Sequence, residues 1–520
     1  MNQSISPKTI RSVIAASSVG TMIEWYDFYI FGMLAKTIST QFFPEGNATA
    51  ALLSTLAIFA AGFIVRPFGA LVFGRLGDLI GRKYTFLLTL VLMGGSTFLI
   101  GLVPGYKTIG IAAPLLVLLL RLIQGLALGG EYGGAATYVA EHSPANKRGY
   151  YTSWIQTTAT LGLFVALGII MLVKLNMSDA SFNGEWGGWR YPFWISILLV
   201  AVSVYIRLKM AESPMFSKLK AEGKTSVNPL KESFRHKGNF KMVLLALFGA
   251  VMGQGVIWYT GQFYAQNFLE TKCNIEFEQS RTIMLWAIAF ATPFFLFFGW
   301  LSDKIGRKWI MMAGMLLGII TYRPIFNTFL KETNTKQWLT KATPTIIIDK
   351  DSLPIKKIIT RDKWHTYLRT QTTIWELKNG TSLTESKVDT IRETSDGFYY
   401  FKSDDKNPSY TNKHLSQQTY RKFIGLVFLL ILYVTMVYGP IAAFLVEMFP
   451  TKIRYTSMSL PYHIGNGVFG GLVPFIGLLL TTSYPSDPLV GLWYPIGVAT
   501  LCLIIGTIYL TNKIDKDVTD

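Results

Sequence analysis

Five ionisable side chains lie inside long apolar stretches of the sequence: Glu24, Asp27, Arg66, Arg121 and Glu131. A charge within a lipid bilayer is costly, so such residues are candidates for ligand binding or proton transfer. Glu24 and Asp27 are three residues apart and would share one face of a helix. Two carboxylates in a low-dielectric medium repel each other, which favours protonation of one of them. We therefore expect Glu24, Asp27 and Glu131 to be the candidates for proton coupling.

Arg66 and Arg121 are the cations of this set. A guanidinium stays charged and offers planar donors to a carboxylate, so both arginines are candidates for binding an anionic group of a substrate. The alternative is a permanent ion pair with an acid of the first apolar segment, since a buried charge without its partner is costly. Glu131 follows Arg121 by ten residues, about 15 Å along a helix, so these two do not pair directly.

The C-terminal half of the chain offers amides and aromatic rings instead of acids. Gln254, Trp258 and Gln262 recur every four residues, which places them on one helix face. Tyr462 and Asn466 have the same spacing. Aromatic surface with a few amides is typical of a small-metabolite pocket, so these five residues are candidates for substrate binding. Aromatic anchoring at the membrane interface and amide contacts between helices are the structural alternatives.

Composition excludes most other classes of protein. Of the 520 residues, 50% are hydrophobic and only 15% are charged, against about 25% charged in soluble domains. The two cysteines are far apart and the five histidines are scattered, so we expect no metal site. No phosphate-binding loop motif is present, and we expect neither an enzyme nor a cofactor. The net charge of +18 indicates basic cytoplasmic loops and a lipid bilayer as partner rather than a nucleic acid.

The elements that carry these residues are long apolar segments. A helix needs about 20 apolar residues to cross a bilayer, and its backbone groups must be paired within the segment. Twelve such segments are expected, at about 12–36, 50–73, 84–103, 111–140, 152–174, 190–208, 242–268, 281–300, 309–326, 423–446, 456–480 and 489–511. Lys and Arg concentrate on the side of the termini and the central loop, which predicts that both termini are cytoplasmic.

The expected organisation is an all-α membrane protein of two six-helix halves with one insertion. Residues 327–420 are polar, with strand-like runs such as 345–348 and 372–375 and the turn signal Asn379-Gly380. We expect there a small, partly β, extramembrane (periplasmic or extracellular) insert between helices 9 and 10. The domains follow as the N-terminal bundle 1–208, the cytoplasmic central loop 209–241, helices 7–9 at 242–326, the insert 327–420, and helices 10–12 at 421–520.

Two sequence motifs occur once in each half. The pattern G-x-x-x-D-x-x-G-R-K follows the second and eighth segments, and E-x-x-P-x-x-x-R follows the fourth and tenth. The first pattern includes Gly74, Asp78, Gly81 and Arg82, repeated as Gly299, Asp303, Gly306 and Arg307; the second includes Glu141 and Arg148, repeated as Glu447 and Arg454. Two matching spacings predict that the halves arose by parallel duplication.

The first repeated motif resembles the signature of the major facilitator superfamily. Within that superfamily the chain is similar to the metabolite:H⁺ symporters, which include proline/betaine, 2-oxoglutarate, citrate and shikimate transporters. The resemblance rests on 23–28 (IEWYDF), 63–69 (FIVRPFG), 121–125 (RLIQG), 129–132 (GGEY) and 462–471 (YHIGNGVFGG). Leu79 departs from the basic residue usual in the first copy of the loop motif, and the insert has no counterpart that we recognise.

The resemblance implies the major facilitator fold and the roles of the loop residues. The repeated Asp and Arg residues, with the second motif, are expected to form a latch that bridges helices when the carrier faces outward. The excess of basic residues in cytoplasmic loops would explain the arginines of these motifs but not the repeated Asp.

The expected function is proton-coupled symport. We expect a monomeric transporter of the bacterial inner (plasma) membrane that takes up a small organic acid or zwitterionic metabolite by alternating access. Its partners would be the small-molecule substrate and protons. A carrier for sugars or drugs, and a non-transporting membrane sensor that uses the insert, are the alternatives.

Overall fold

The computed structural model describes most of the chain. The described residues are 18, 21–23, 25–80, 82–129, 136, 139–140, 143–209, 235, 237–341, 343–348, 356–359, 365–377, 379–393, 399–403, 408–449 and 454–512. Two compact units make up the chain. One contains residues 1–265, 285–323 and 427–520, and the other contains residues 266–284 and 324–426.

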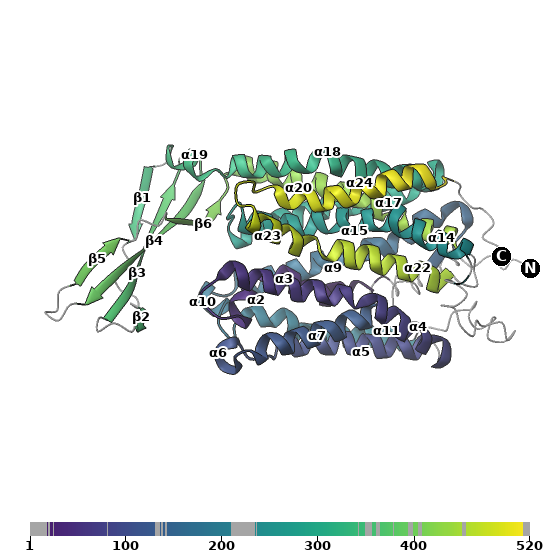
Figure 1. Ribbon diagram of the computed structural model, residues 1–520, viewed down its shortest axis with the longest axis horizontal. Helices are drawn as coiled ribbons and strands as arrows, with labels where there is room; N and C mark the ends of the chain where they lie inside the picture. Colours follow the sequence, from purple (N-terminus) through teal and green to yellow (C-terminus); the bar gives the residue numbers. More distant parts are fainter. Residues whose placement is uncertain are drawn as a thin grey trace, which may run out of the picture. The chain divides into compact units, whose positions relative to one another are not determined.

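The first unit is a bundle of long helices (Figure 1). In the N-terminal half, the helical residues 25–33 are followed by α2 Ala35–Phe42, α3 Ala48–Ile64, α4 Arg66–Ile80, α5 Arg82–Ile100, α6 Tyr106–Ile109, α7 Ala112–Leu128, α9 Arg148–Leu175, α10 Asp179–Phe182 and α11 Tyr191–Lys209. In the C-terminal half lie α14 Lys237–Ala246, α15 Met252–Tyr259, α16 Ala265–Thr271, α17 Phe277–Ile305, α18 Lys308–Glu332, α20 Gln417–Tyr438, α21 Ile441–Met448, α22 Arg454–Tyr462, α23 Val473–Ser483 and α24 Trp493–Tyr509. The second unit includes α16 from residue 266, the first turns of α17 and α20, and the last turns of α18.

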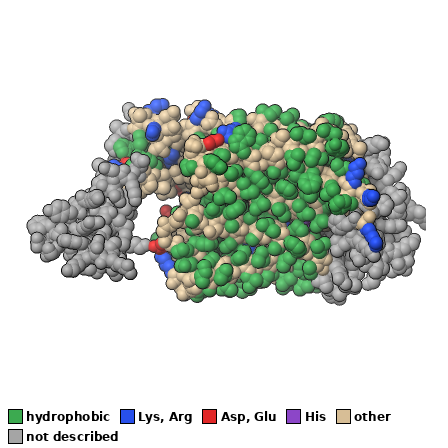
Figure 2. All heavy atoms as spheres, viewed as in Figure 1, with side chains coloured by type: hydrophobic (Ala, Val, Ile, Leu, Met, Phe, Trp, Pro, Cys, Tyr) green, Lys and Arg blue, Asp and Glu red, His purple; other side chains and the backbone are tan. Residues whose placement is uncertain are grey.

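Eight helices in the described part of the chain are long and apolar enough to cross a membrane. They are Ala48–Phe73, Arg148–Leu175, Lys237–Thr271, Phe277–Ile305, Lys308–Leu339, Gln417–Met448, Ser457–Ser483 and Val490–Tyr509. The shorter apolar helices Leu87–Ile100 and Ala112–Leu128, together with α11, coincide with three further expected segments. Figure 2 shows hydrophobic side chains covering the visible face of the bundle, as contact with lipid tails requires.

The seventh expected segment is a composite helix. Two π-helical segments, Leu247–Val251 and Thr260–Tyr264, flank α15. Such segments interrupt the regular α-helical pattern and occur often at functional sites. Gln254 and Trp258 therefore share a face of α15, whereas Gln262 lies in the second π-helical segment. A third π-helical segment, His463–Gly470, continues α22 and carries Asn466.

Glycines let α7 lie close to α3 and α4. A Cβ atom at Gly125 would lie 1.9 Å from the carbonyl oxygen of Gly62, and one at Gly129 would lie 2.1 Å from that of Arg66. Small residues at helix contacts allow this approach. Arg66, at the start of α4, therefore lies beside the end of α7, whereas Arg121 lies beside α3, since a Cβ atom at Gly62 would lie 3.2 Å from Arg121 O.

The second unit contains an antiparallel six-stranded sheet (Figure 1). Its strands are β1 Thr343–Ile348, β2 Lys356–Ile359, β3 His365–Glu376, β4 Ser382–Glu393, β5 Tyr399–Ser403 and β6 Ser409–His414. The order is β1-β3-β4-β5, with β2 also paired to β3 and β6 to β4. The Asn379-Gly380 turn joins β3 to β4, and Gly380 has a φ of +80°. Helix α18 continues to Glu332, and α19 Thr335–Leu339 precedes the sheet.

A buried lysine fastens the sheet within its own unit. Lys413 of β6 is 3% exposed, and its Nζ donates to the carbonyl oxygen of Thr333 at 2.6 Å. Its backbone N–H donates to Asn274 O at 2.8 Å, and its carbonyl accepts from Glu276 N at 2.9 Å. The end of the sheet is thus tied to the turn between α16 and α17 and to the end of α18. Burial lowers the pKa of Lys413.

Candidate functional site

Arg66 and Arg121 lie deep in the bundle among aromatic rings. Arg66 is 2% exposed and Arg121 is fully buried. The guanidinium carbons of Arg66 and Arg121 lie 4.4 Å and 4.3 Å from the centroid of the same ring, that of Phe28. Arg66 also lies 4.3 Å from the Phe63 ring, and Arg121 5.0 Å from the Phe59 ring. Cation–π contacts with these rings stabilise two buried positive charges.

Within the described part of the chain, the two guanidiniums have few hydrogen-bond partners. Arg121 donates to the side-chain oxygen of Gln124 and, at 3.4 Å, to Phe59 O. Gln124 in turn donates to Asp27 O at 3.1 Å. Among the described residues, Arg121 Nε and Arg66 Nε and Nη2 have no acceptor. Buried donors of this kind can bind an anion or water.

Asp27 lies in the same region without an ion-pair partner among the described residues. Its side chain is fully buried, and neither carboxylate oxygen makes a hydrogen bond within the described part of the chain. The hydroxyl of Ser196 faces it. The alternative of a permanent ion pair between either arginine and Asp27 is thus not what the structure contains. Glu24 and Glu131 lie outside the described residues.

Aromatic rings from both halves meet beside the arginines. Trp258 of α15 lies 6.2 Å from Trp25 and 5.4 Å from Tyr29, measured between ring centroids. Tyr259 lies 5.0 Å from Phe63 in an edge-to-face contact. These contacts place Trp258, a candidate from the sequence, directly against the N-terminal half.

Several polar atoms of this layer have no partner in the described part of the chain. They are Tyr29 Oη, Gln254 Oε1, Trp258 Nε1, Tyr259 Oη, both side-chain polar atoms of Gln262, and both ring nitrogens of His463. Buried polar groups are normally hydrogen-bonded. Tyr29, Trp258 and Tyr259 among them lie where rings of the two halves are in contact, and unpaired buried groups of this kind can bind a polar ligand or water.

A hydrogen-bonded chain of side chains lies in the C-terminal half. Gln254 Nε2 donates to Asn466 Oδ1 at 3.4 Å, and Asn466 Nδ2 donates to Tyr462 Oη at 3.3 Å. Tyr462 Oη lies 2.8 Å from Tyr438 Oη. The structure thus joins Gln254, Tyr462 and Asn466, three candidates from the sequence. Tyr438 was missed because a single Tyr in an apolar segment gives no pattern.

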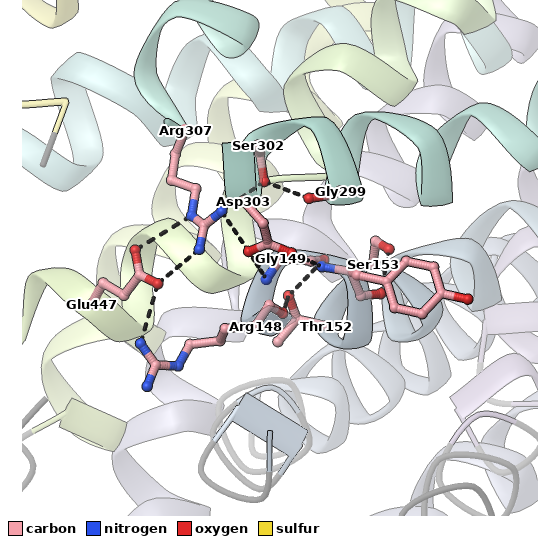
Figure 3. Close-up of polar contacts among 10 residues, drawn as sticks. Arg148, Gly149, Thr152, Ser153, Gly299, Ser302, Asp303, Arg307 and Glu447 are labelled. Atoms are coloured by element: carbon pink, nitrogen blue, oxygen red, sulfur yellow. Dashed lines mark hydrogen bonds and ion pairs between the residues drawn. The ribbon is translucent and has the colours of Figure 1, made fainter. Parts of the chain in front are cut away.

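A second polar cluster joins the two halves at one end of the bundle (Figure 3). Arg307 pairs with Asp303 at 2.7 Å and with Glu447 at 2.9 Å, and Arg148 pairs with the same Glu447 oxygen at 3.2 Å. The four side chains are between 2% and 9% exposed. Burial alone would lower the pKa of Arg307, but its hydrogen bond to Glu447 and the charges of Glu447 and Asp303 outweigh burial and raise it.

Asp303 also caps a helix of the opposite half. Its two carboxylate oxygens accept from the backbone N–H groups of Gly149 and Tyr150, each at 2.8 Å (Figure 3). Both groups belong to the first turn of α9, where a negative charge is favourable. A Cβ atom at Gly149 would lie 2.6 Å from Gly299 O, and one at Gly299 would lie 2.5 Å from the Ser153 side chain. The halves are therefore in close backbone contact at this cluster.

The repeated motifs connect in a way that the sequence did not predict. Glu447 belongs to the second copy of its motif and Arg148 to the first copy, so the pair crosses between the halves. Gly306 adopts a φ of +95° at the turn between α17 and α18. Gly81 and Glu141 lie outside the described residues, as do the side chains of Asp78, Arg82 and Arg454 and the surroundings of Gly74.

The sequence is similar to those of known membrane transporters. Residues 13–233 match the family described as sugar (and other) transporter. The Escherichia coli inner membrane metabolite transport protein YhjE is 32% identical over 488 residues, covering 93% of this chain and 90% of that protein. The alpha-ketoglutarate permease of Escherichia coli is 36% identical over 322 residues, covering 62% of this chain and 72% of that protein.

Solved structures show the same fold. The xylose transporter XylE of Escherichia coli, in a partially occluded inward open conformation, matches with a TM-score of 0.62 at 15% identity. The match covers 97% of this chain and 98% of that chain. The fold is thus the twelve-helix major facilitator fold that the sequence predicts, and the expected resemblance is confirmed. The chain belongs to the metabolite transporters of the major facilitator superfamily.

Proposed function

We propose that this transporter takes up a small organic acid or zwitterionic metabolite together with protons, by alternating access. Arg66 and Arg121 bind the anionic group of the substrate. Asp27, with Glu24 and Glu131, takes up and releases the proton. The proton gradient is the only energy source required. The carrier acts as a monomer in the bacterial inner membrane, with both termini in the cytoplasm.

The observation that carries this proposal is the pair of buried guanidiniums around Phe28. Their centres lie 4.4 Å and 4.3 Å from one ring, so they are separated by no more than the sum of these distances. Three of their N–H-bearing nitrogens have no acceptor among the described residues. A carboxylate would supply acceptors and cancel charge, which makes an anionic substrate more favourable there than a neutral sugar.

The cluster around Glu447 supports alternation between two states. Arg148 and the start of α9 come from one half, and Asp303, Arg307 and Glu447 come from the other. These contacts hold the expected cytoplasmic end closed, and they must break for the carrier to open inward. A ligand that binds the two states with different free energy can drive such a change. We assign the latch role to these residues and, by the sequence repeat, to Asp78, Arg82, Glu141 and Arg454.

Uptake by proteoliposomes tests the proposal. Purified protein would be screened with organic acids, betaines, amino acids and sugars, with an inward proton gradient and with the gradient collapsed by an ionophore. We expect gradient-dependent accumulation of a carboxylate-bearing compound, and none with Arg121→Ala. Accumulation of a neutral sugar alone would favour the sugar carrier. Absence of any uptake, with ligand binding to the insert, would favour a sensor.

A further inference from the structure

The chain of side chains that ends at Gln254 has a defined direction. The amide N–H of Gln254 donates to Asn466, and the amide N–H of Asn466 donates to Tyr462. The hydroxyl oxygen of Tyr462 is therefore an acceptor, and its short contact to Tyr438 fixes the Tyr462 hydroxyl in turn. An amide whose N–H₂ group is engaged presents its carbonyl oxygen at the other side. That oxygen, Gln254 Oε1, is buried and has no donor among the described residues.

Gln254 faces the same side of its helix as Trp258. The two residues are one turn apart in the regular helix α15. Trp258 contacts Trp25 and Tyr29 of the opposite half. The unsatisfied carbonyl of Gln254 therefore belongs to the layer between the halves. Arg66 lies in the same layer, and the side chains that act on it electrostatically include Tyr438 and Tyr462.

We propose that the side-chain carbonyl of Gln254 accepts a hydrogen bond from a donor group on the substrate. Tyr438 is a positioning residue that orients Gln254 through Tyr462 and Asn466. This rests on the proposed function, in which Arg66 and Arg121 bind the substrate, and it narrows the substrate class. The substrate is a small carboxylate that carries an N–H or O–H group, as in an amino, imino or hydroxy acid. A buried acceptor left without a donor is costly, so the same carboxylate with that group methylated is rejected.

Two matched substrate pairs test the substrate class. The first is L-proline against N,N-dimethyl-L-proline, and the second is lactate against 2-methoxypropanoate. Uptake and thermal shift of the purified protein would be measured for all four. We expect the donor-bearing member to be preferred by about tenfold or more in at least one pair, the scale of one hydrogen bond in a buried site. Equal handling of both members of each pair, or no response to any of the four, would overturn the proposal.

Substitutions on the chain test the role of Tyr438. Tyr438→Phe should raise KM about tenfold with little change in kcat and should lower the preference for the donor-bearing member. Tyr433→Phe is the matched control, since its hydroxyl lies on the same helix α20 and accepts from Thr321 at 3.2 Å. Combining Tyr438→Phe with Gln254→Leu should add nothing to Gln254→Leu alone, because Tyr438 acts through Gln254.

The outcomes separate this proposal from the proposed function. If Arg121→Ala abolishes uptake but Gln254→Leu keeps the parent's preference for the donor-bearing substrate, the role of Arg121 is supported. Recognition of a hydrogen-bond donor by Gln254 is then refuted. If Gln254→Leu loses the preference and Tyr438→Phe keeps it, only the positioning role falls. If the parent protein accumulates nothing in a proton gradient, the proposed function itself fails.

Discussion

Asp303→Asn tests the contact that joins the two halves at one end of the bundle. In the parent protein, the Asp303 carboxylate accepts two N–H groups of α9, each at 2.8 Å, and pairs with Arg307 at 2.7 Å. The pair with Arg307 lies within the C-terminal half. We therefore expect it to persist in both states and to leave their difference in free energy unchanged. An Asn retains one carbonyl acceptor for α9 and loses the other acceptor and the charge.

The expected loss follows from these contacts. A hydrogen bond to a charged group contributes about 1.5–3 kcal/mol, and a charge at a helix N-terminus about 0.3–1 kcal/mol. We therefore expect Asp303→Asn to destabilise the closed end by about 2 kcal/mol, which is about a 30-fold shift in the equilibrium between closed and open forms. Asn in place of Asp preserves the side-chain volume, so folding should be little affected.

Pulsed electron paramagnetic resonance measures the shift directly. Spin labels would be placed at Lys147 and Lys304, both of which are exposed. The native cysteines, Cys273 and Cys502, are both buried. Asp303→Asn should increase the long-distance fraction in lipid nanodiscs. Asp487→Asn, which breaks the pair with Arg323 at 3.1 Å within one half, is the control and should leave the distribution unchanged. Identical distributions for Asp303→Asn and the parent would refute the latch.

Four further substitutions follow from the same contacts. Arg121→Ala should abolish uptake while the protein still elutes as a monodisperse peak in size-exclusion chromatography; full transport would remove Arg121 from the mechanism. Asp27→Asn should lose accumulation driven by a proton gradient but keep exchange of substrate across the membrane, and intact pH-driven accumulation would exclude Asp27 as the proton site. Gly299→Ala should open the latch in the spin-label assay, because its Cβ would lie 2.5 Å from Ser153; an unchanged distribution would show that the helices can shift to admit it. Lys413→Ala should cost about 2–3 kcal/mol of stability through the lost buried hydrogen bond to Thr333, seen as a lower Tm, whereas the exposed Lys387→Ala should have little effect.

Sequence patterns located the charged and polar layer because the bilayer makes such residues rare. Arg66, Arg121 and Asp27 stand out in apolar segments for that reason, and the structure brings them into one region. The spacing of Asp303 and Arg307 predicts opposite charges one helical turn apart, and the structure pairs them. Local spacing is sufficient for contacts of this kind.

Contacts between distant segments could not be predicted in the same way. Arg148 and Glu447 are 299 residues apart, and Asp303 is 154 residues from Gly149. Which copy of a repeated motif meets which depends on how the halves pack, and both pairings are compatible with the sequence. Tyr438 is a similar case, since its role depends on the position of Tyr462 on another helix.

The contact between Lys413 and Thr333 has a consequence for the intervening chain. It links Thr333, directly after α18, to Lys413, shortly before α20, through one lysine side chain. Foreign domains are accepted best where both ends of a segment are adjacent at a surface. Replacing residues 334–412 by a compact reporter, such as a fluorescent protein, should therefore leave the packing of α18 and α20 unchanged. The reporter would then move together with these two helices.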